Sequence, residues 1–437
     1  MIRFSINTLG CKVNLCESDD ISRELTRLGF GMVGYGDDPD FCIINTCTVT
    51  AESDRKARQL IRRIKNASKR SKIIVTGCFT GSNKKFLEDT GIDYIINNSR
   101  KDSIPGFLYG LIKNDIPTGP CTDHPINNIF RHSRPFIKIQ DGCEQNCTYC
   151  IIPGVRGRYR SMGLADIIRK IDYIEVCGYE EIVLTGIHIG KYGADTEKVK
   201  STEADPAVRD LGRLITEILS RTMIKRIRIS SLEINEITAG LLEVIKNNSE
   251  RIAPHLHIPL QSGSDKILGS MGRPYNRDHF IRKIKEVREV IPDAAITTDI
   301  IVGFPGETAG DFEETVLLVK KLDFSKLHVF KYSPRPGTIA SKIVGQVDFR
   351  QKSERSKELR DLGDRMRDDF INKNLGRRLL VICERQDRGK NTVSGTSGEY
   401  IKVYFKTERD FGKIHGKLVQ VASVKKYRGG LWAQETV

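Results

Sequence analysis

Three cysteines lie close together in the run CEQNCTYC, at spacings that place them on one loop. Cys143, Cys147 and Cys150 form the pattern C-x3-C-x2-C directly after the strand-like residues FIKIQ. Three thiolates on one tight loop can hold three corners of a [4Fe-4S] cluster and leave the fourth iron open. A structural zinc knuckle is the alternative, but it normally pairs C-x2-C units and needs a fourth ligand. The spacing, and Tyr149 before the last cysteine, favour the iron–sulfur cluster.

An open iron suits chelation of the amino and carboxylate groups of S-adenosylmethionine (SAM). Transfer of one electron into the sulfonium would break a carbon–sulfur bond and release a 5′-deoxyadenosyl radical, which is chemistry of the cofactor itself. The loop therefore resembles that of the radical SAM superfamily. Four residues at predicted strand ends are candidates for contacts with SAM, although each polar one could equally cap a helix or satisfy loop amides. They are Gly186, Ser231, Glu233 and Gln261.

A second cysteine triad is spread along the first part of the chain. Cys11, Cys47 and Cys78 each follow a short apolar strand pattern, in the strings TLGCKVN, INTCTVT and TGC. Ligand sites of open parallel α/β sheets gather beyond the carboxyl ends of the strands, so these distant cysteines could converge. Each alone could be an inert buried thiol. Together they suggest a second cluster.

The other five of the eleven cysteines show no ligand spacing. An odd count in a chain without an evident signal peptide argues against a disulfide framework and favours a cytoplasmic protein. Cys42 and Cys177 look like core positions, and Cys16 is of interest because it follows Cys11 by five residues. These five are Cys16, Cys42, Cys121, Cys177 and Cys383.

The elements that must position these residues indicate an α/β protein of three domains, since 437 residues exceed one core. Strands and helices alternate over residues 1–130, which predicts a parallel sheet. Six further strand–helix units over 131–370 predict a partial (β/α)6 barrel with its chemistry at the carboxyl ends of the strands. Helical residues 351–373 form a connector that runs into the last predicted domain, residues 371–437, where short alternating strands beyond the connector predict a small β-barrel. The turn-rich residues 193–206 are expected to form a surface loop. No apolar run approaches the length of a membrane helix.

The net charge of +15 makes a polyanionic partner plausible. Residues 55–72 carry nine Lys or Arg and no acid, and residues 371–437 carry 14 basic against 6 acidic residues. A solvated helix face explains the first run equally well, but two basic regions together favour nucleic acid. Two smaller features suit RNA as well, because arginines grip phosphates and aromatic rings stack on bases. They are Arg156, Arg158, Tyr159 and Arg160 beside the cluster loop, and Tyr400, Lys402, Tyr404 and Phe405 in the predicted barrel. The arginines of the first feature could instead pair with acidic neighbours.

The chain resembles the radical SAM methylthiotransferase family over essentially its whole length. The resemblance rests on TLGCKVN, INTCTVT, TGC, GCEQNCTYCIIP, VLTGIH, HIPLQSGSD, MGRPY and IVGFPGET. It implies an auxiliary [4Fe-4S] cluster on Cys11, Cys47 and Cys78, a SAM-binding [4Fe-4S] cluster on Cys143, Cys147 and Cys150, and a C-terminal RNA-binding TRAM domain. It also implies two roles for SAM, as a methyl donor to sulfur and as the source of the radical.

Members of this family modify different targets. TLGCKVN, INTCTVT and CIIPGVRGR are most similar to the branch that modifies N6-threonylcarbamoyladenosine at tRNA position 37. Cys16, Gly154 and Phe79-Thr80-Gly81 depart from the pattern of that branch. The alternatives are isopentenyladenosine in tRNA, a ribosomal protein, or an RNA-binding protein with structural metal sites. The resemblance implies tRNA and a flavodoxin or ferredoxin reductant as partners.

Overall fold

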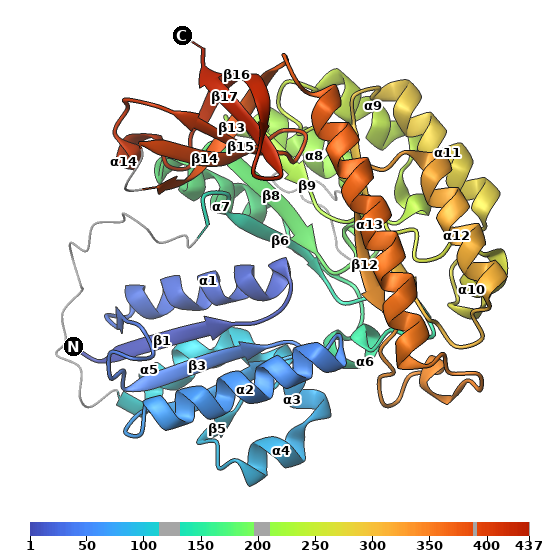
Figure 1. The fold of residues 1–437 in the computed structure, drawn as a ribbon. Coiled ribbons are helices and arrows are strands. Elements are labelled where there is room, and N and C mark those ends of the chain that lie inside the picture. The colour runs from blue at the N-terminus through green and yellow to red at the C-terminus, as the bar shows by residue number, and fades with distance from the viewer. Residues whose placement is uncertain (113–131, 196–209, 388–390, 437) are drawn as a thin grey trace.

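The computed structural model describes residues 1–437 except 113–131, 196–209, 388–390 and 437 (Figure 1). Part of the predicted surface loop at 193–206 and Cys121 therefore lie outside the described residues. Among the described residues, no helix combines the length and apolarity needed to cross a membrane.

The first part of the chain forms a parallel five-stranded sheet in the order β2-β1-β3-β4-β5. Its strands are β1 (Arg3–Thr8), β2 (Gly31–Met32), β3 (Phe41–Thr46), β4 (Lys72–Gly77) and β5 (Tyr94–Ile95). Its helices are α1 (Lys12–Arg27), α2 (Ala51–Ala67), α3 (Phe79–Ser82), α4 (Lys84–Asp89), the 3-10 helix η1 (Asn98–Ser103) and α5 (Ile104–Ile112). The three strands expected before the cysteines are all present.

Side chains of β3 alternate between the two faces of this sheet and give each face its own core. Ile43 packs with Ile21 of α1 and Leu108 of α5 on one face. Cys42 and Ile44, which point the opposite way, pack with residues of α2 and α4 on the other. Successive strand residues point to opposite faces, so this nearly continuous apolar strand needs helices on both sides.

The central part is a curved wall of six parallel strands, as predicted. In order these are β6 (Phe136–Asp141), β8 (Glu181–Gly186), β9 (Arg226–Ile229), β10 (His255–His257), β11 (Ala295–Val302) and β12 (Lys326–Lys331). A parallel bridge between Ser231 and His257 joins the β6-β8-β9 half to the β10-β11-β12 half. The short β7 (Arg160–Ser161) pairs antiparallel with the end of β6.

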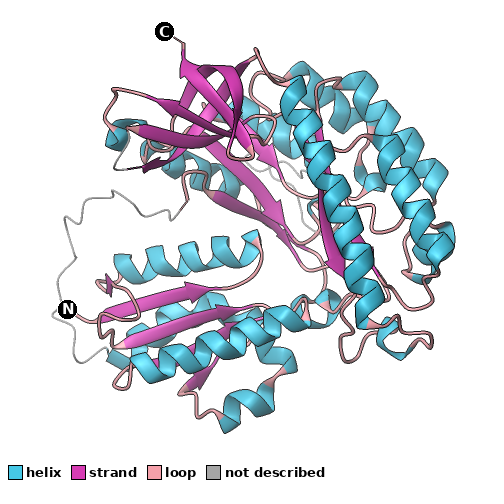
Figure 2. Cartoon of the chain, in the orientation of Figure 1, coloured by secondary structure: helices cyan, strands magenta, loops and turns pink. Residues whose placement is uncertain are grey.

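Helices cover the outer side of this wall (Figure 2). They include α7 (Leu164–Val176), α8 (Leu211–Arg221), α9 (Ala239–Asn247), α11 (Arg277–Val290), α12 (Ala309–Leu322) and α13 (Phe349–Lys373). The short α6 (Ile152–Arg156) lies instead at the junction with the N-terminal domain (Figure 1), and other short helices are α10 (Asp265–Ser270), η2 (Ile189–Lys191), η4 (Ile234–Glu236) and η5 (Ala340–Lys342). The predicted connector, α13, is more than a link, because Leu359, Leu362 and Met366 belong to the barrel core.

The last part is a closed barrel in the order β13-β14-β15-β17-β16. Its elements are β13 (Arg378–Asp387), β14 (Thr392–Ser397), β15 (Lys402–Lys406), α14 (Phe411–Ile414), β16 (Leu418–Tyr427) and β17 (Gly430–Glu435). Sequence patterns predicted β13, β15 and β16. They missed β14, whose residues TVSGTS are small and polar, and β17, which follows a tight turn after β16.

Candidate functional site

The first cysteine triad gathers at the carboxyl edge of the N-terminal sheet. Cys11 caps α1 after β1, Cys47 follows β3, and Cys78 follows β4. These three strands are neighbours in the sheet, so their ends meet. Burial raises the pKa of the Cys78 thiol. The nearby Cys11 and Cys47 thiolates also raise this pKa, whereas Arg156 and Lys101 lower it. The expected convergence is therefore present.

Gly77 allows the Cys78 loop to approach the Cys47 loop. Its φ of +96° suits glycine, and an added Cβ would lie 2.3 Å from the Thr46 carbonyl oxygen. Backbone rather than a flexible side chain occupies that space. A side chain at position 77 would therefore force the two cysteine loops apart.

The second triad lies on the loop between β6 and α6. The Cys143 amide donates to the Gly157 carbonyl at 2.9 Å, and the Cys150 amide donates to the Cys147 carbonyl at 3.0 Å. Burial raises the pKa of the Cys150 thiol to about 12, and the neighbouring Cys147 and Cys143 thiolates act in the same direction. The three thiols thus share one partly buried loop. All described cysteines are free thiols, and among the described residues no three His, Cys, Asp or Glu side chains are arranged to hold a single metal ion.

Arg273 is a site residue that sequence reasoning missed. Its Nη1 donates to Cys147 Sγ at 3.3 Å, its Nη2 donates to a Glu233 carboxylate oxygen, and its Nε lies 3.1 Å from the Tyr275 hydroxyl. Its side chain is buried, and the Glu233 carboxylate is the acidic group that pairs with it. The string MGRPY contains Arg273, but no spacing linked it to a cysteine 126 residues away.

His188 is a second missed residue beside the same loop. Its Nδ1 lies 3.5 Å from Cys143 Sγ, and its Nε2 lies 2.5 Å from a Glu236 carboxylate oxygen. The partly buried Tyr159, predicted to stack on a base, places its hydroxyl 3.3 Å from His188 Nδ1. The buried His188–Glu236 pair therefore supports one side of the cluster loop.

The four predicted SAM contacts occupy different environments. Gly186 ends β8 so close to β6 that an added Cβ would lie 2.7 Å from the Gln140 carbonyl oxygen. Ser231 is exposed and bridges to His257 through its backbone. Glu233 is held by Arg273. Gln261 has a φ of +69° and faces a cavity beside Cys150.

This cavity, of about 220 Å³, lies between the two cysteine triads. Val49 and Thr50 reach it from the Cys47 loop, whereas Tyr149 to Ile152 reach it from the second loop. The ends of three barrel strands complete its wall with Gln261, Asp299, Ile301, Phe330, Lys331, Tyr332 and Ser333. One largely apolar chamber is thus bounded by residues next to both triads.

The prediction that Arg156 grips phosphate is wrong, because its side chain is completely buried between the two domains. Its Nη1 pairs with Glu17 at 3.1 Å and Asp141 at 2.9 Å, and its Nη2 donates to Asn14 Oδ1 at 2.6 Å. Asn14 in turn donates to the carbonyls of Leu9 and Thr46, next to the first triad. Arg156 therefore links the two cysteine regions. Arg158 and Arg160 are exposed, and each lies near an acidic neighbour, Glu144 at 3.9 Å and Asp141 at 3.5 Å.

Glu17 of α1 is the centre of this buried network. Its carboxylate accepts from Lys101 at 2.5 Å, Lys138 at 3.0 Å and Arg156 at 3.1 Å. Burial alone would raise its pKa, but Lys101, Arg156 and Lys138 together lower the pKa to about 2. Glu17 is thus ionised at neutral pH, and it ties the N-terminal sheet to β6 and α6.

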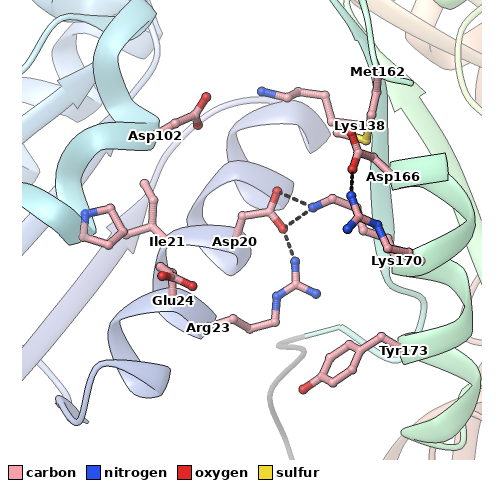
Figure 3. Close-up of a pocket in the computed structure, with 12 residues that line it drawn as sticks. Asp20, Ile21, Arg23, Glu24, Asp102, Lys138, Met162, Asp166, Lys170 and Tyr173 are labelled. Atoms are coloured by element: carbon pink, nitrogen blue, oxygen red, sulfur yellow. Dashed lines mark hydrogen bonds and ion pairs between the residues drawn. The ribbon is translucent and has the colours of Figure 1, made fainter. Parts of the chain in front are cut away.

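A cleft of about 680 Å³ lies beside this network between α1 and α7. Figure 3 shows Asp20 facing Lys170 across it, and Lys170 Nζ is 2.9 Å from Asp20 Oδ1. Cys16 lies at the same junction, where its thiol donates to the Phe136 carbonyl at 3.1 Å. Cys16 therefore contacts the barrel rather than the first triad.

The remaining cysteines include one correction. Cys42 and Cys383 are buried in cores, whereas Cys177, predicted to be a core residue, is only partly buried at the end of α7.

The aromatic residues predicted to bind RNA on the C-terminal barrel need correction. Phe405 is fully buried in the barrel core. Tyr400 stacks on His255 at 4.5 Å, at the junction with the central barrel. Tyr404 packs against Tyr427, which packs against Trp432, and these three rings are partly exposed. Phe405 is therefore excluded from stacking on a base, whereas the predicted Tyr404 belongs to a partly exposed aromatic group that also includes Tyr427 and Trp432.

Comparisons with known proteins agree with this arrangement. Residues 137–319 match the Radical SAM superfamily, and residues 3–97 match Uncharacterized protein family UPF0004. Threonylcarbamoyladenosine tRNA methylthiotransferase MtaB of Bacillus subtilis is 34% identical, over 97% of this chain and 94% of the relative. The Thermotoga maritima protein of the same name is 34% identical, over 96% and 94%.

A relative whose name gives a different substrate is slightly more distant. tRNA-2-methylthio-N(6)-dimethylallyladenosine synthase of Endomicrobium trichonymphae is 31% identical, over 89% of this chain and 90% of the relative. Among solved structures, the radical SAM methyltransferase TsrM of Kitasatospora setae has a TM-score of 0.56 at 13% identity, covering 78% of this chain and 77% of that one. At this level of identity, the likeness shows the fold alone.

Proposed function

Because this chain belongs to the radical SAM methylthiotransferase family, we propose that it adds a methylthio group to C2 of N6-threonylcarbamoyladenosine at position 37 of tRNA. The observation that carries the proposal is the chamber between two cysteine triads. The MtaB relatives, at 34% identity, favour this substrate over the isopentenyladenosine alternative. The ribosomal-protein alternative and the RNA-binding protein with structural metal sites receive no comparable support.

The cofactors of this function are two [4Fe-4S] clusters and SAM. We assign the auxiliary cluster to Cys11, Cys47 and Cys78, and the SAM cluster to Cys143, Cys147 and Cys150. When bound, the clusters would relay a reducing electron and present the sulfur, and SAM would supply both the radical, on reductive cleavage, and the methyl group. The donor set suits them, since each triad offers three thiols and no competing disulfide among the described cysteines.

The residues of the chain prepare the chamber for this chemistry. Arg273 places a buried positive charge 3.3 Å from Cys147 Sγ, where it offsets the charge of a thiolate-bound cluster. Ile301 and Phe330 supply apolar surface to the wall of the chamber. Gln261 and Asp299 offer polar groups to the substrate or to SAM. Together they give the chamber both apolar and polar contacts for the reacting groups.

Three further assignments belong to this proposal. The domains are residues 1–130 with the auxiliary cluster, 131–370 with the SAM cluster, and 371–437 as a TRAM RNA-binding domain. A flavodoxin or ferredoxin supplies the electron. A cytoplasmic location suits a tRNA substrate.

Nucleoside mass spectrometry of tRNA from a deletion strain tests the function. The strain should lack 2-methylthio-N6-threonylcarbamoyladenosine and should regain it from the intact gene. Cys147→Ala should abolish SAM cleavage, whereas Cys78→Ala should retain some cleavage and form no methylthio product. Full product from either variant would contradict the assignment of two clusters. An unchanged level of the nucleoside in the deletion strain, with no redundant enzyme, would contradict the substrate.

A further inference from the structure

The outer face of α2 carries a regular series of basic residues that the proposed active site does not use. Six basic side chains occur as three pairs of neighbouring residues, and each pair follows the previous one by seven residues. Seven residues are almost two helical turns, so successive pairs within the helix return to the same face about 10.5 Å further along. The pairs are Arg55-Lys56, Arg62-Arg63 and Lys69-Arg70, and all six residues are exposed. The last pair lies in the turn that follows α2.

This face points away from the core of its domain. Ala57, Leu60, Ile61 and Ile64 form the buried side of α2. The basic pairs fall between these positions and therefore lie on the opposite side. Residues 55–72 contain no acid, and Glu52, one turn before them, lies 2.6 Å from Arg55 and 3.7 Å from Lys56. Glu52 therefore offsets part of the charge of the first pair, whereas the two later pairs have no acid within their own stretch of the chain.

Two arginines on this face are held in place by aromatic rings. The Arg62 guanidinium lies 5.4 Å from the centre of the Phe86 ring, and that of Arg63 lies 5.5 Å from the centre of the Tyr35 ring. Such stacking uses the flat side of a guanidinium and leaves its N–H groups available at the edge. A phosphate can accept two of those N–H groups at once.

The helix begins at the rim of the chamber between the cysteine triads. Val49 and Thr50, directly before α2, line that chamber. The Ala51 amide donates to Ser333 Oγ at 3.0 Å, and Asp54 pairs with Arg335 at 2.6 Å, so the barrel fixes this end. From this rim the 17 residues of α2 extend for about 25 Å. A substrate whose base enters the chamber would have its backbone close to this helix.

We propose that the outer face of α2 binds the ribose-phosphate backbone of the tRNA arm that carries the target adenosine. The inference rests on the proposed function for the identity of the RNA. It adds a second basic contact region, on the N-terminal domain, to the one expected on the C-terminal barrel. Phosphate contacts of this kind position a nucleic acid and carry no sequence information.

Removal of four charges from α2 tests the proposal. The variant Arg55→Gln, Lys56→Gln, Arg62→Gln, Arg63→Gln retains residues of good helix propensity. Its affinity for tRNA is measured against salt concentration. Each lost phosphate contact reduces the slope of log K against log salt by about 0.7–0.9, so the slope should fall by about 3. The dissociation constant at low salt should rise by about tenfold or more.

A matched control removes the same charge elsewhere. Arg282→Gln, Lys285→Gln, Lys320→Gln, Lys321→Gln changes exposed residues of α11 and α12, on the outer side of the central barrel (Figure 1). This control should retain the parent affinity and slope. Equal loss in both variants would show a general effect of net charge and would overturn the proposal, as would parent-like binding by the α2 variant. Iron content and circular dichroism check the fold of each protein.

A second measurement needs no variant. Photo-crosslinking of tRNA to the unaltered protein should label peptides from residues 55–72. Absence of label there, with label on the C-terminal barrel, would mean that the α2 face is merely solvated. If the parent protein binds tRNA at α2 but forms no methylthio product, the proposed function fails while this inference stands. If product forms but tRNA makes no contact at α2, this inference fails while the proposed function stands.

Discussion

Replacement of Glu17 by Gln should destabilise the junction between the N-terminal sheet and the barrel. Glu17 is 2% exposed and contacts three cations, Lys101, Lys138 and Arg156. Asp141 is the other carboxylate that pairs with Arg156, so the variant leaves the buried Lys101 and Arg156 and the partly buried Lys138 beside one acid. Glutamine keeps the size of the side chain and removes its charge. The change therefore isolates the electrostatic contribution.

The size of the effect follows from the pKa of Glu17. Its surroundings lower that pKa from the ordinary value of 4.5 to about 2. One pH unit corresponds to about 1.4 kcal/mol, so ionised Glu17 adds about 3 kcal/mol to the free energy of unfolding. Removal of one partner from a buried ion pair commonly costs about 3–5 kcal/mol, which agrees. We expect a loss of about 3–5 kcal/mol.

Urea unfolding followed by circular dichroism measures this loss. Glu24→Gln is the matched control, because Glu24 lies on the same helix and forms an exposed pair with Arg27. Exposed pairs of this kind contribute at most about 1 kcal/mol. If Glu17→Gln costs no more than Glu24→Gln, the network does not hold the junction and the reasoning is refuted.

The pH dependence gives a second check on Glu17. A depressed pKa in the folded state contributes stability that is present above pH 4.5 and is lost as the pH falls towards about 2. The difference between the parent and Glu17→Gln should therefore be constant from pH 6 to pH 8 and should shrink below about pH 4.5. A difference that grows on acidification would contradict the assigned charge.

Three further outcomes follow from the geometry. Gly77→Ala should lower the iron content from about eight to about four atoms per chain, because its Cβ would displace the Thr46 carbonyl beside the first triad; unchanged iron would contradict this. Arg273→Gln should lower the reduction potential of the SAM cluster in a redox titration, because the change removes a cation and a hydrogen bond from Cys147. Arg273→Lys, which keeps the cation, should restore part of that potential. Glu181→Gln should speed hydrogen exchange in residues 397–401. Glu181 orients Arg228, and Arg228 donates to the Ser397 and Gly398 carbonyls at 2.9 Å. Unchanged exchange would refute this coupling.

Much of the fold was predictable because strong local patterns specify it. The six barrel strands carry long apolar or alternating runs, and each lies where its pattern predicted. The strand β14 was missed because its residues TVSGTS have no apolar pattern, and pairing with β13 and β15 makes it a strand. Local sequence carries little of that tertiary information.

The candidate site was predictable only where its residues are close in sequence or end strands. Cys143, Cys147 and Cys150 share one loop, so their proximity follows from spacing alone. Arg273 reaches Cys147 from 126 residues away, and no local pattern reveals such a contact. Arg156 was assigned to phosphate because a surface arginine beside the site is plausible. Its burial and its pairing with Glu17 depend on the packing of α1 against β6 and α6, which local sequence does not reveal.

The central claim is tested most directly with purified, reconstituted protein and SAM carrying a deuterated methyl group. Two tRNAs are offered separately, one with N6-threonylcarbamoyladenosine and one with isopentenyladenosine at position 37. Nucleoside mass spectrometry should find the heavy methylthio group on threonylcarbamoyladenosine and not on isopentenyladenosine. Heavy label on isopentenyladenosine alone, or on neither nucleoside while SAM is cleaved, would contradict the proposed substrate.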